Sequence, residues 1–264
     1  MNIILYLIIF AIGSLCGSFL TLATYRIPLH KDITHEHSFC PNCNHKLSFL
    51  DLIPILSYLF LGGKCRYCKK KISIRYFLFE IFTGMSFVAL AYILGFNIYK
   101  LYPNQILEFF IYATYIVFLL MVAGIDFKNK RIEKSVLIFG ITIACINIMY
   151  QFIYTTMIGS RYNLNRIILY LVFIIIILII EIETIRKNTK YDYCFDLILL
   201  SVILSLFTYE ITTIFSIIGC LIIVFFRAVI NKKQKSNKTI KTPVASYLIA
   251  SHFIVLIISG LYII

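Results

Sequence analysis

The sequence predicts an all-α polytopic membrane protein, with a bundle of about eight transmembrane helices and a cytoplasmic zinc-binding loop that contains four cysteines. Of its 264 residues, 61% are hydrophobic and 14% are charged, and the mean hydropathy is +0.91. An ordinary soluble domain has roughly 25% charged residues, so a single soluble globule is excluded. Apolar runs of about 20 residues, each long enough to cross the hydrocarbon core of a bilayer, recur along the whole chain. Two pairs of cysteines lie in one basic loop.

The expected transmembrane spans are the apolar runs bounded by charged or turn residues. They cover residues 2–24, 74–96, 106–125, 135–156, 167–185, 194–208, 211–230 and 244–264. The apolar stretch 197–230 is too long for one span, so we divide it at its polar cluster, Thr208 to Glu210. The sixth span is short as a result.

The distribution of basic residues predicts the orientation of the chain. Of 25 Lys and Arg, 22 lie in alternate loops and three, Lys100, Arg161 and Arg166, lie in the intervening ones. Lys and Arg are retained on the cytoplasmic side of membrane proteins. We therefore expect both termini outside and the loop 25–73 in the cytoplasm. The net charge of +13 is explained by orientation, and we expect no direct nucleic-acid partner.

The chain is thus expected to have three parts: a first transmembrane helix (1–24), a cytoplasmic zinc-knuckle loop (25–73) and a transmembrane bundle (74–264). Cys40, Cys43, Cys65 and Cys68 form two C-x-x-C pairs in the loop. This spacing lets four thiolates converge on one Zn²⁺. Disulfides are the alternative, and a reducing cytoplasm disfavours them. Histidines of the same loop are alternative ligands, namely His30, His35, His37 and His45.

Between the cysteine pairs lies the apolar segment 49–60, which is too short to span a membrane. We expect it at the membrane interface or re-entering the bundle. Asp51 is expected to cap a helix N-terminus there.

Several short motifs in the first hundred residues resemble the bacterial type IV prepilin peptidase family, also called prepilin leader peptidase and N-methyltransferase. They are Gly17-Ser18-Phe19-Leu20, Arg26-Ile27-Pro28, Cys40-Pro41-Asn42-Cys43, Asp51-Leu52-Ile53-Pro54, Ser57-Tyr58-Leu59, Gly63-Lys64-Cys65-Arg66-Tyr67-Cys68, Ile72-Ser73, Arg75-Tyr76 and Glu80. The likeness is dense over residues 13–84 and sparse beyond them.

The resemblance implies a bacterial plasma-membrane aspartic protease that removes the basic leader of type IV prepilins or pseudopilins at the cytoplasmic face. Many members also methylate the new N-terminus, which implies S-adenosylmethionine as a cofactor. Such a protease needs two neighbouring carboxyl groups, one ionised and one protonated. By its position in the family pattern, Asp126 matches the first catalytic aspartate and Asp196 the second. Asp192 is the rival for the second position.

The chain departs from the family pattern near these acids. Tyr193 and Phe195 occupy two positions that are glycines in a Gly-x-Gly-Asp motif, and Ile132-Glu133 replaces an Ile-Pro pair. Glycine permits close backbone approach, so these aromatic residues are expected to narrow or block the peptide cleft. The alternative function is a protease-inactive member that acts as a methyltransferase or as an assembly component of a pilus or DNA-uptake system. A solute transporter has little support.

Two hypotheses account for Glu80. By resemblance it matches a family position and supports methyl transfer, or it is a buried partner for Arg75 or Arg26.

Overall fold

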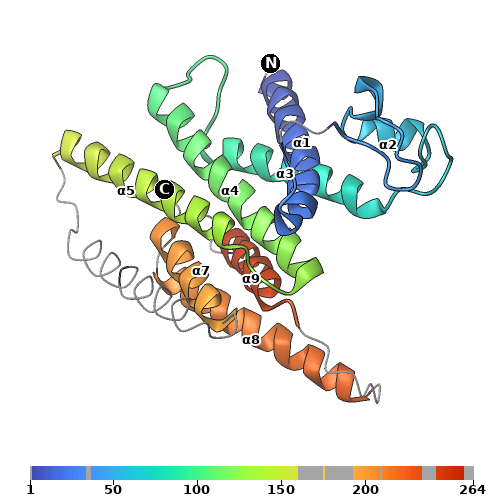
Figure 1. Cartoon of the computed structure of the whole chain (residues 1–264). Coiled ribbons are helices and arrows are strands. Elements are labelled where there is room, and N and C mark those ends of the chain that lie inside the picture. Colours follow the sequence, from blue (N-terminus) through green and yellow to red (C-terminus); the bar gives the residue numbers. More distant parts are fainter. Residues whose placement is uncertain are drawn as a thin grey trace. The chain divides into compact units, whose positions relative to one another are not determined.

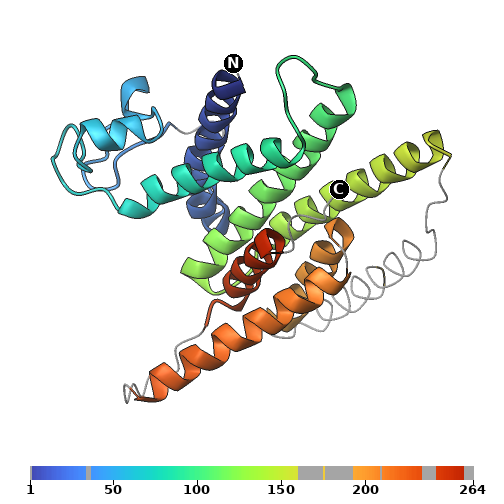
Figure 2. The ribbon, with the colours of Figure 1, turned by 180° about the vertical axis from the view of Figure 1, so that it is seen from behind.

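The computed structural model describes residues 2–33, 37–159, 175, 193–208, 210–233 and 242–258. Within these residues the regular structure is helical and contains no β-strand, as the sequence predicts. The chain divides into two compact units, Met1–Met121 and Val122–Ile264. Figure 1 shows the helices in chain order, and Figure 2 shows them from behind.

Among the residues that the structure describes, four helices are long and apolar enough to cross a membrane. They are α1 (Asn2–Arg26), α3 (Ile74–Ile93), α4 (Pro103–Asn129) and α5 (Lys134–Met157). Three more helices contain shorter apolar stretches. They are α7 (Tyr193–Phe207), α8 (Glu210–Lys233) and α9 (Val244–Ile258). The predicted break near Thr208 is confirmed, because α7 ends and α8 begins there. The expected span 167–185 lies, apart from residue 175, outside the described residues.

In the first unit, α1 and α3 pack closely because glycines remove side chains from their contact (Figure 1). A Cβ atom at Gly13 would lie 2.9 Å from the Cα of Gly84, and one at Gly17 would lie 2.9 Å from the Cα of Glu80. Lipid tails are as apolar as the helices, so helix association in a membrane depends on such close packing. Substituting either glycine would push the two helices apart.

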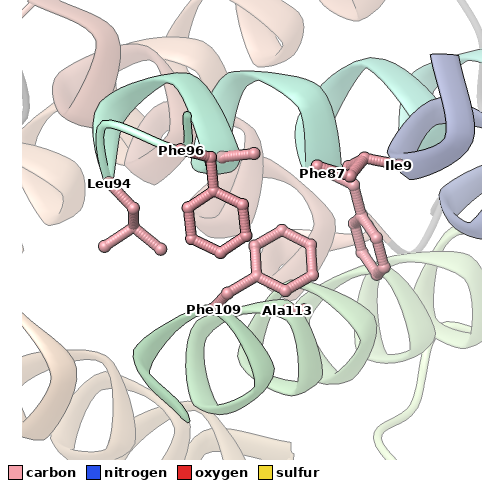
Figure 3. Packing of buried hydrophobic residues seen from close by; sticks show 7 residues of the cluster. Ile9, Phe87, Leu94, Phe96, Phe109 and Ala113 are labelled. Atoms are coloured by element: carbon pink, nitrogen blue, oxygen red, sulfur yellow. The ribbon is translucent and has the colours of Figure 1, made fainter. Parts of the chain in front are cut away.

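An aromatic cluster joins α1, α3 and the first half of α4 (Figure 3). Its buried members are Ile9, Phe87, Ala91, Leu94, Phe96, Phe109 and Ala113. The rings of Phe87 and Phe109 meet edge to face, with centroids 5.8 Å apart. This geometry is favourable for aromatic pairs, because the positive edge of one ring faces the negative face of the other.

The segment between α1 and α3 folds into short elements. The 3₁₀ helices η1 (Ile27–Leu29) and η2 (Phe49–Asp51) are followed by the helix α2 (Leu56–Phe60). Arg26 at the end of α1 donates from its guanidinium to the carbonyls of Asp32 and His37, which ties the start of the segment to that helix.

In the second unit, α8 and α9 lie side by side (Figure 2). Polar side chains join the two helices. The hydroxyl of Ser216 lies 3.0 Å from Nδ1 of the fully buried His252, and Ser251 donates to the carbonyl of Ser216. Asn147 of α5 donates to the carbonyl of Leu206 in α7. Hydrogen bonds between helices contribute to association where no water competes.

Candidate metal centre and candidate carboxylate site

The two cysteine knuckles have the same backbone geometry. Asn44 donates its N–H to the carbonyl of Cys40, and Lys69 donates to that of Cys65, at 2.8 and 3.0 Å. Both donor residues have a left-handed backbone, with φ of 54° and 58°. Each knuckle therefore turns sharply enough to direct two sulfurs to one point.

The four cysteine sulfurs lie within 4.8 Å of one another. The Sγ atoms of Cys40 and Cys68 are 3.9 Å apart. A tetrahedral site with Zn–S bonds of about 2.3 Å requires sulfurs about 3.8 Å apart, so the donor set fits such an ion. Cys40 and Cys65 are buried. The cluster can hold a metal ion, as its spacing predicts.

Backbone donors favour the thiolate form of Cys65. The N–H groups of Cys68 and Tyr67 point at its sulfur and lower its pKa to about 7. Metal ligation requires deprotonated thiols, so this lowered pKa favours ligation by Cys65.

Asp51 links η2 to the second knuckle. Its carboxylate accepts from Ser48 and Tyr67 and lies 2.6 Å from Nε of Arg66. Burial acts to raise the pKa of Asp51, but the hydrogen bonds from Arg66 and Ser48 outweigh it and lower the pKa to about 2. The predicted role of Asp51 as an N-cap is wrong. Ser48 is the N-cap. Asp51 is the third helical residue of a capping box, and its carboxylate accepts from the backbone N–H of Ser48.

Asp126 is fully buried near the C-terminal end of α4. Its Oδ2 accepts from the backbone N–H of Ser246 at 2.8 Å and from the Ser246 hydroxyl at 2.9 Å. Ser246 lies in the first turn of α9, where N–H groups have no partner within the helix. The N-terminal end of α9 therefore faces the carboxylate.

Tyr193 also contacts Asp126. Its hydroxyl donates to Oδ1 at 2.6 Å and accepts from the N–H of Ala245 at 3.0 Å. This phenol belongs to one of the two positions where the resemblance led us to expect glycine. The side chain of Phe195, at the second such position, lies outside the described part of the chain.

Asp196 is buried, with 3% of its surface exposed, in the first turn of α7. It follows Tyr193 by three residues, and residues at that spacing share a helix face. Because the Tyr193 phenol contacts Asp126, the first turn of α7 is held beside α4 and α9. Asp192, the rival acid, lies outside the described residues.

Glu80 is buried in α3 and accepts from the backbone N–H of Ile55 at 2.8 Å. The Ser18 hydroxyl is its second donor. The structure thus pairs Glu80 with backbone and hydroxyl donors, which the sequence did not predict.

Two features of the carboxylate site could not be read from the motifs. Tyr193 was expected to narrow or block the peptide cleft. Its hydrogen bond to Asp126 could not be predicted, because it depends on how α4 and α7 pack. Ser246 was missed, although Pro243 just before α9 is a signal for a helix start that places the next residues in an N-terminal turn.

Comparison with known proteins gives consistent matches. The family model described as Bacterial Peptidase A24 N-terminal domain matches residues 11–94. The prepilin leader peptidase/N-methyltransferase of Vibrio cholerae is 42% identical over 139 residues, which cover 49% of this chain and 51% of the relative. That of Bacillus subtilis is 38% identical over 132 residues and 50% of each chain. That of Myxococcus xanthus is 40% identical over 99 residues, covering 38% of this chain and 29% of the relative.

No solved structure matches the chain. The chain spans about half the length, or less, of the curated relatives that it matches. The predicted resemblance to the bacterial type IV prepilin peptidase family is confirmed by these matches.

Proposed function

From this family relationship, we propose that the chain is a prepilin peptidase of the bacterial plasma membrane. It cuts the basic leader from type IV prepilin-like proteins or pseudopilins at the cytoplasmic face. The catalytic groups are Asp126 and Asp196 of the helical bundle 74–264. The observation that carries the proposal is a fully buried Asp126 carboxylate held by α9 and by Tyr193, a residue one helical turn from the buried Asp196.

The proposed chemistry is hydrolysis by a carboxyl pair. The ionised group takes a proton from water as the water oxygen attacks the scissile carbonyl, and the protonated group gives its proton to the leaving amide nitrogen. Asp126 accepts hydrogen bonds at both carboxylate oxygens, so we assign it the ionised role and Asp196 the protonated one. A substrate anchored by its own membrane helix presents its leader near the inner membrane border. This confinement raises its effective concentration at the site.

The distribution of basic residues supports the proposed orientation, with the loop 25–73 in the cytoplasm and both termini outside. The metal of the four-cysteine cluster is proposed to be a structural Zn²⁺ bound by Cys40, Cys43, Cys65 and Cys68. A loop of this size has little core of its own, so the metal supplies folding free energy.

Methyl transfer is the second activity in the relatives' printed names, and S-adenosylmethionine would be its methyl donor. The Glu80 carboxylate accepts from the Ile55 N–H and the Ser18 hydroxyl, so the contacts that the structure gives it lie within the chain itself. We therefore derive no methyl-transfer step from the described residues.

One observation favours a second candidate, a protease-inactive member that acts as a methyltransferase or in pilus or DNA-uptake assembly. The Tyr193 phenol occupies the Oδ1 side of Asp126, where the family pattern has no side chain. A peptide reaching Asp126 must displace this hydroxyl or approach from another side.

The first test is processing of a co-expressed prepilin. Asp126→Ala and Asp196→Ala should each abolish leader removal, while Glu108→Ala, at the opposite end of α4, should leave it intact. Continued cleavage in both aspartate variants would overturn the mechanism.

The second test separates the two candidates by restoring both glycines. If the wild-type chain does not cleave and the Tyr193→Gly/Phe195→Gly variant does, the protease-inactive function is correct. Cleavage by the wild-type chain supports the peptidase.

A further inference from the structure

The segment between the two knuckles exposes a cluster of large apolar side chains. They are Phe49, Leu50, Leu52, Leu56, Leu59 and Phe60, which we call the apolar face. Phe49 is 82% exposed and Phe60 is 85% exposed. Leu56, Leu59 and Phe60 stand at helical spacings of three and four, so they share one side of α2. Large apolar side chains that are exposed together in one short segment point to an interaction site.

The other side of α2 is fixed to the rest of its unit. The ring of Tyr58 stacks on Phe77, with centroids 5.0 Å apart. Ile55, just before α2, has a φ of 63°, which is strained for a β-branched residue. The hydrogen bond from its N–H to the buried Glu80 holds this conformation in place. The orientation of the apolar face is therefore set by contacts to α3.

These contacts also give the level of α2 along α3. Glu80 follows the first residue of α3, Ile74, by six positions, which is about 9 Å along a helix axis. Helices that lie in a membrane interface bury their apolar side about 5–10 Å into it. The exposed residues Ile74, Leu78, Phe82 and Met85 of α3 form a stripe that runs from the start of this helix past the level of Glu80. If α3 enters the bilayer at its first residue, α2 lies within the interfacial layer.

Basic residues flank the apolar face. Lys64, Lys69, Lys70 and Lys71 are exposed in the second knuckle. This knuckle is joined to the end of α2, because Gly63 donates to the carbonyl of Tyr58 and accepts from the N–H of Ile72. Each Lys or Arg near an anionic lipid surface strengthens binding to it. A basic peptide would be repelled by this rim, so the charge favours an anionic lipid surface.

We propose that the apolar face of residues 49–60 inserts into the interfacial layer of the membrane and that the lysines of the second knuckle bind anionic lipid headgroups. The surface is a lipid-binding site that fixes the loop 25–73, called the metal loop below because it contains the four cysteines, against the bilayer. It is independent of whether the carboxylate site cleaves peptides.

The test uses the absence of tryptophan from the sequence. In the full chain, Phe60→Trp introduces a single indole into the apolar face. The protein is reconstituted in phosphatidylcholine, with or without phosphatidylglycerol, and its fluorescence is quenched by lipids brominated just below the headgroup or by aqueous iodide. We expect strong quenching by the brominated lipids, weak quenching by iodide, and more lipid quenching when phosphatidylglycerol is present.

Charge reversal tests the role of the lysines. In the Phe60→Trp background, Lys70→Glu should remove most of the extra lipid quenching that phosphatidylglycerol causes. Each basic residue strengthens binding to an anionic lipid surface by roughly a fivefold factor. The matched control, Lys100→Glu in the loop after α3, should have no effect.

Three results would overturn the proposal. Quenching by iodide would show that water covers the face, and quenching by neither agent would show that protein covers it. Equal lipid quenching with and without phosphatidylglycerol, unchanged by Lys70→Glu, would overturn the role of the anionic headgroups.

Discussion

The metal loop and the carboxylate site differ in how their residues come together. The four cysteines lie between residues 40 and 68, and two short turns of the same shape direct their sulfurs. At the other site, Asp126 and Ser246 are 120 residues apart, and Tyr193 comes from a third helix. Local spacing determines the first site, whereas packing of three helices determines the second. The family model matches residues 11–94, which include the loop, and it does not extend to the carboxylate site.

The largest expected effect is at the metal loop. Cys65→Ser removes one of four ligands, and metal binding to such sites contributes about 10–16 kcal/mol to folding. We expect the purified variant to lose its bound metal, measured by elemental analysis, and its loop to become sensitive to protease. Cys145→Ser, at an exposed cysteine outside the cluster, is the control. Full metal content in Cys65→Ser would refute the four-cysteine site.

At the carboxylate site, Tyr193→Phe should have the next largest effect. It keeps the ring but removes the donor to Asp126 and the acceptor for the Ala245 N–H. Hydrogen bonds to charged groups contribute about 1.5–3 kcal/mol, so the melting temperature should fall. Tyr154→Phe, on the exposed side of α5, is the matched control. An equal melting temperature for both variants would mean that the phenol does not hold the site together.

Ser246→Ala should have a smaller effect than Tyr193→Phe. It removes the hydroxyl donor to Asp126, but the backbone N–H of the same residue remains. We expect a loss of about 1 kcal/mol in the free energy of unfolding. Ser201→Ala, whose hydroxyl bonds within its own helix, gives the baseline for losing a serine hydroxyl. A loss no larger than this baseline would contradict the assignment.

The smallest effect concerns Asp51, because Arg66 is 45% exposed and water screens the pair. The pKa of Asp51 is lowered from 3.8 to about 2. The charge of Asp51 therefore stabilises the loop fully at pH values above 3.8, and this contribution is lost as the pH falls toward 2. Asp51→Asn should therefore speed proteolysis of the loop by the same factor across the neutral pH range. Arg66→Gln should have a weaker effect, because Asp51 also accepts from Ser48 and Tyr67. A pH-dependent factor near neutrality would show that another group is responsible.

The sequence alone predicted the helical fold and the metal cluster. Hydrophobic runs and the C-x-x-C spacing involve residues that are close in sequence. The structures that they predict therefore do not depend on how distant segments pack. The break near Thr208 was predicted in the same way, from polar residues within an apolar run. The sequence analysis placed the N-cap at Asp51, three residues after the actual N-cap, Ser48. Both residue types are suited to the start of a helix.

The environment of Asp126 could not be predicted. That Tyr193 bonds to the carboxylate depends on helix packing over long sequence separations, and so does the approach of the α9 N-terminus to it. From the sequence, Tyr193 was expected to obstruct the peptide cleft. In the folded chain, its hydroxyl also donates a hydrogen bond to Asp126.

The central claim is that Asp126 and Asp196 serve one reaction. An experimental structure of the chain in lipid, with ordered water resolved, tests it most directly. The account predicts one water molecule within hydrogen-bond reach, about 2.6–3.2 Å, of a carboxyl oxygen from each residue. Two carboxyl groups that face apart and share no water would contradict it, and the metal loop would then remain as the part of the family pattern that this chain retains.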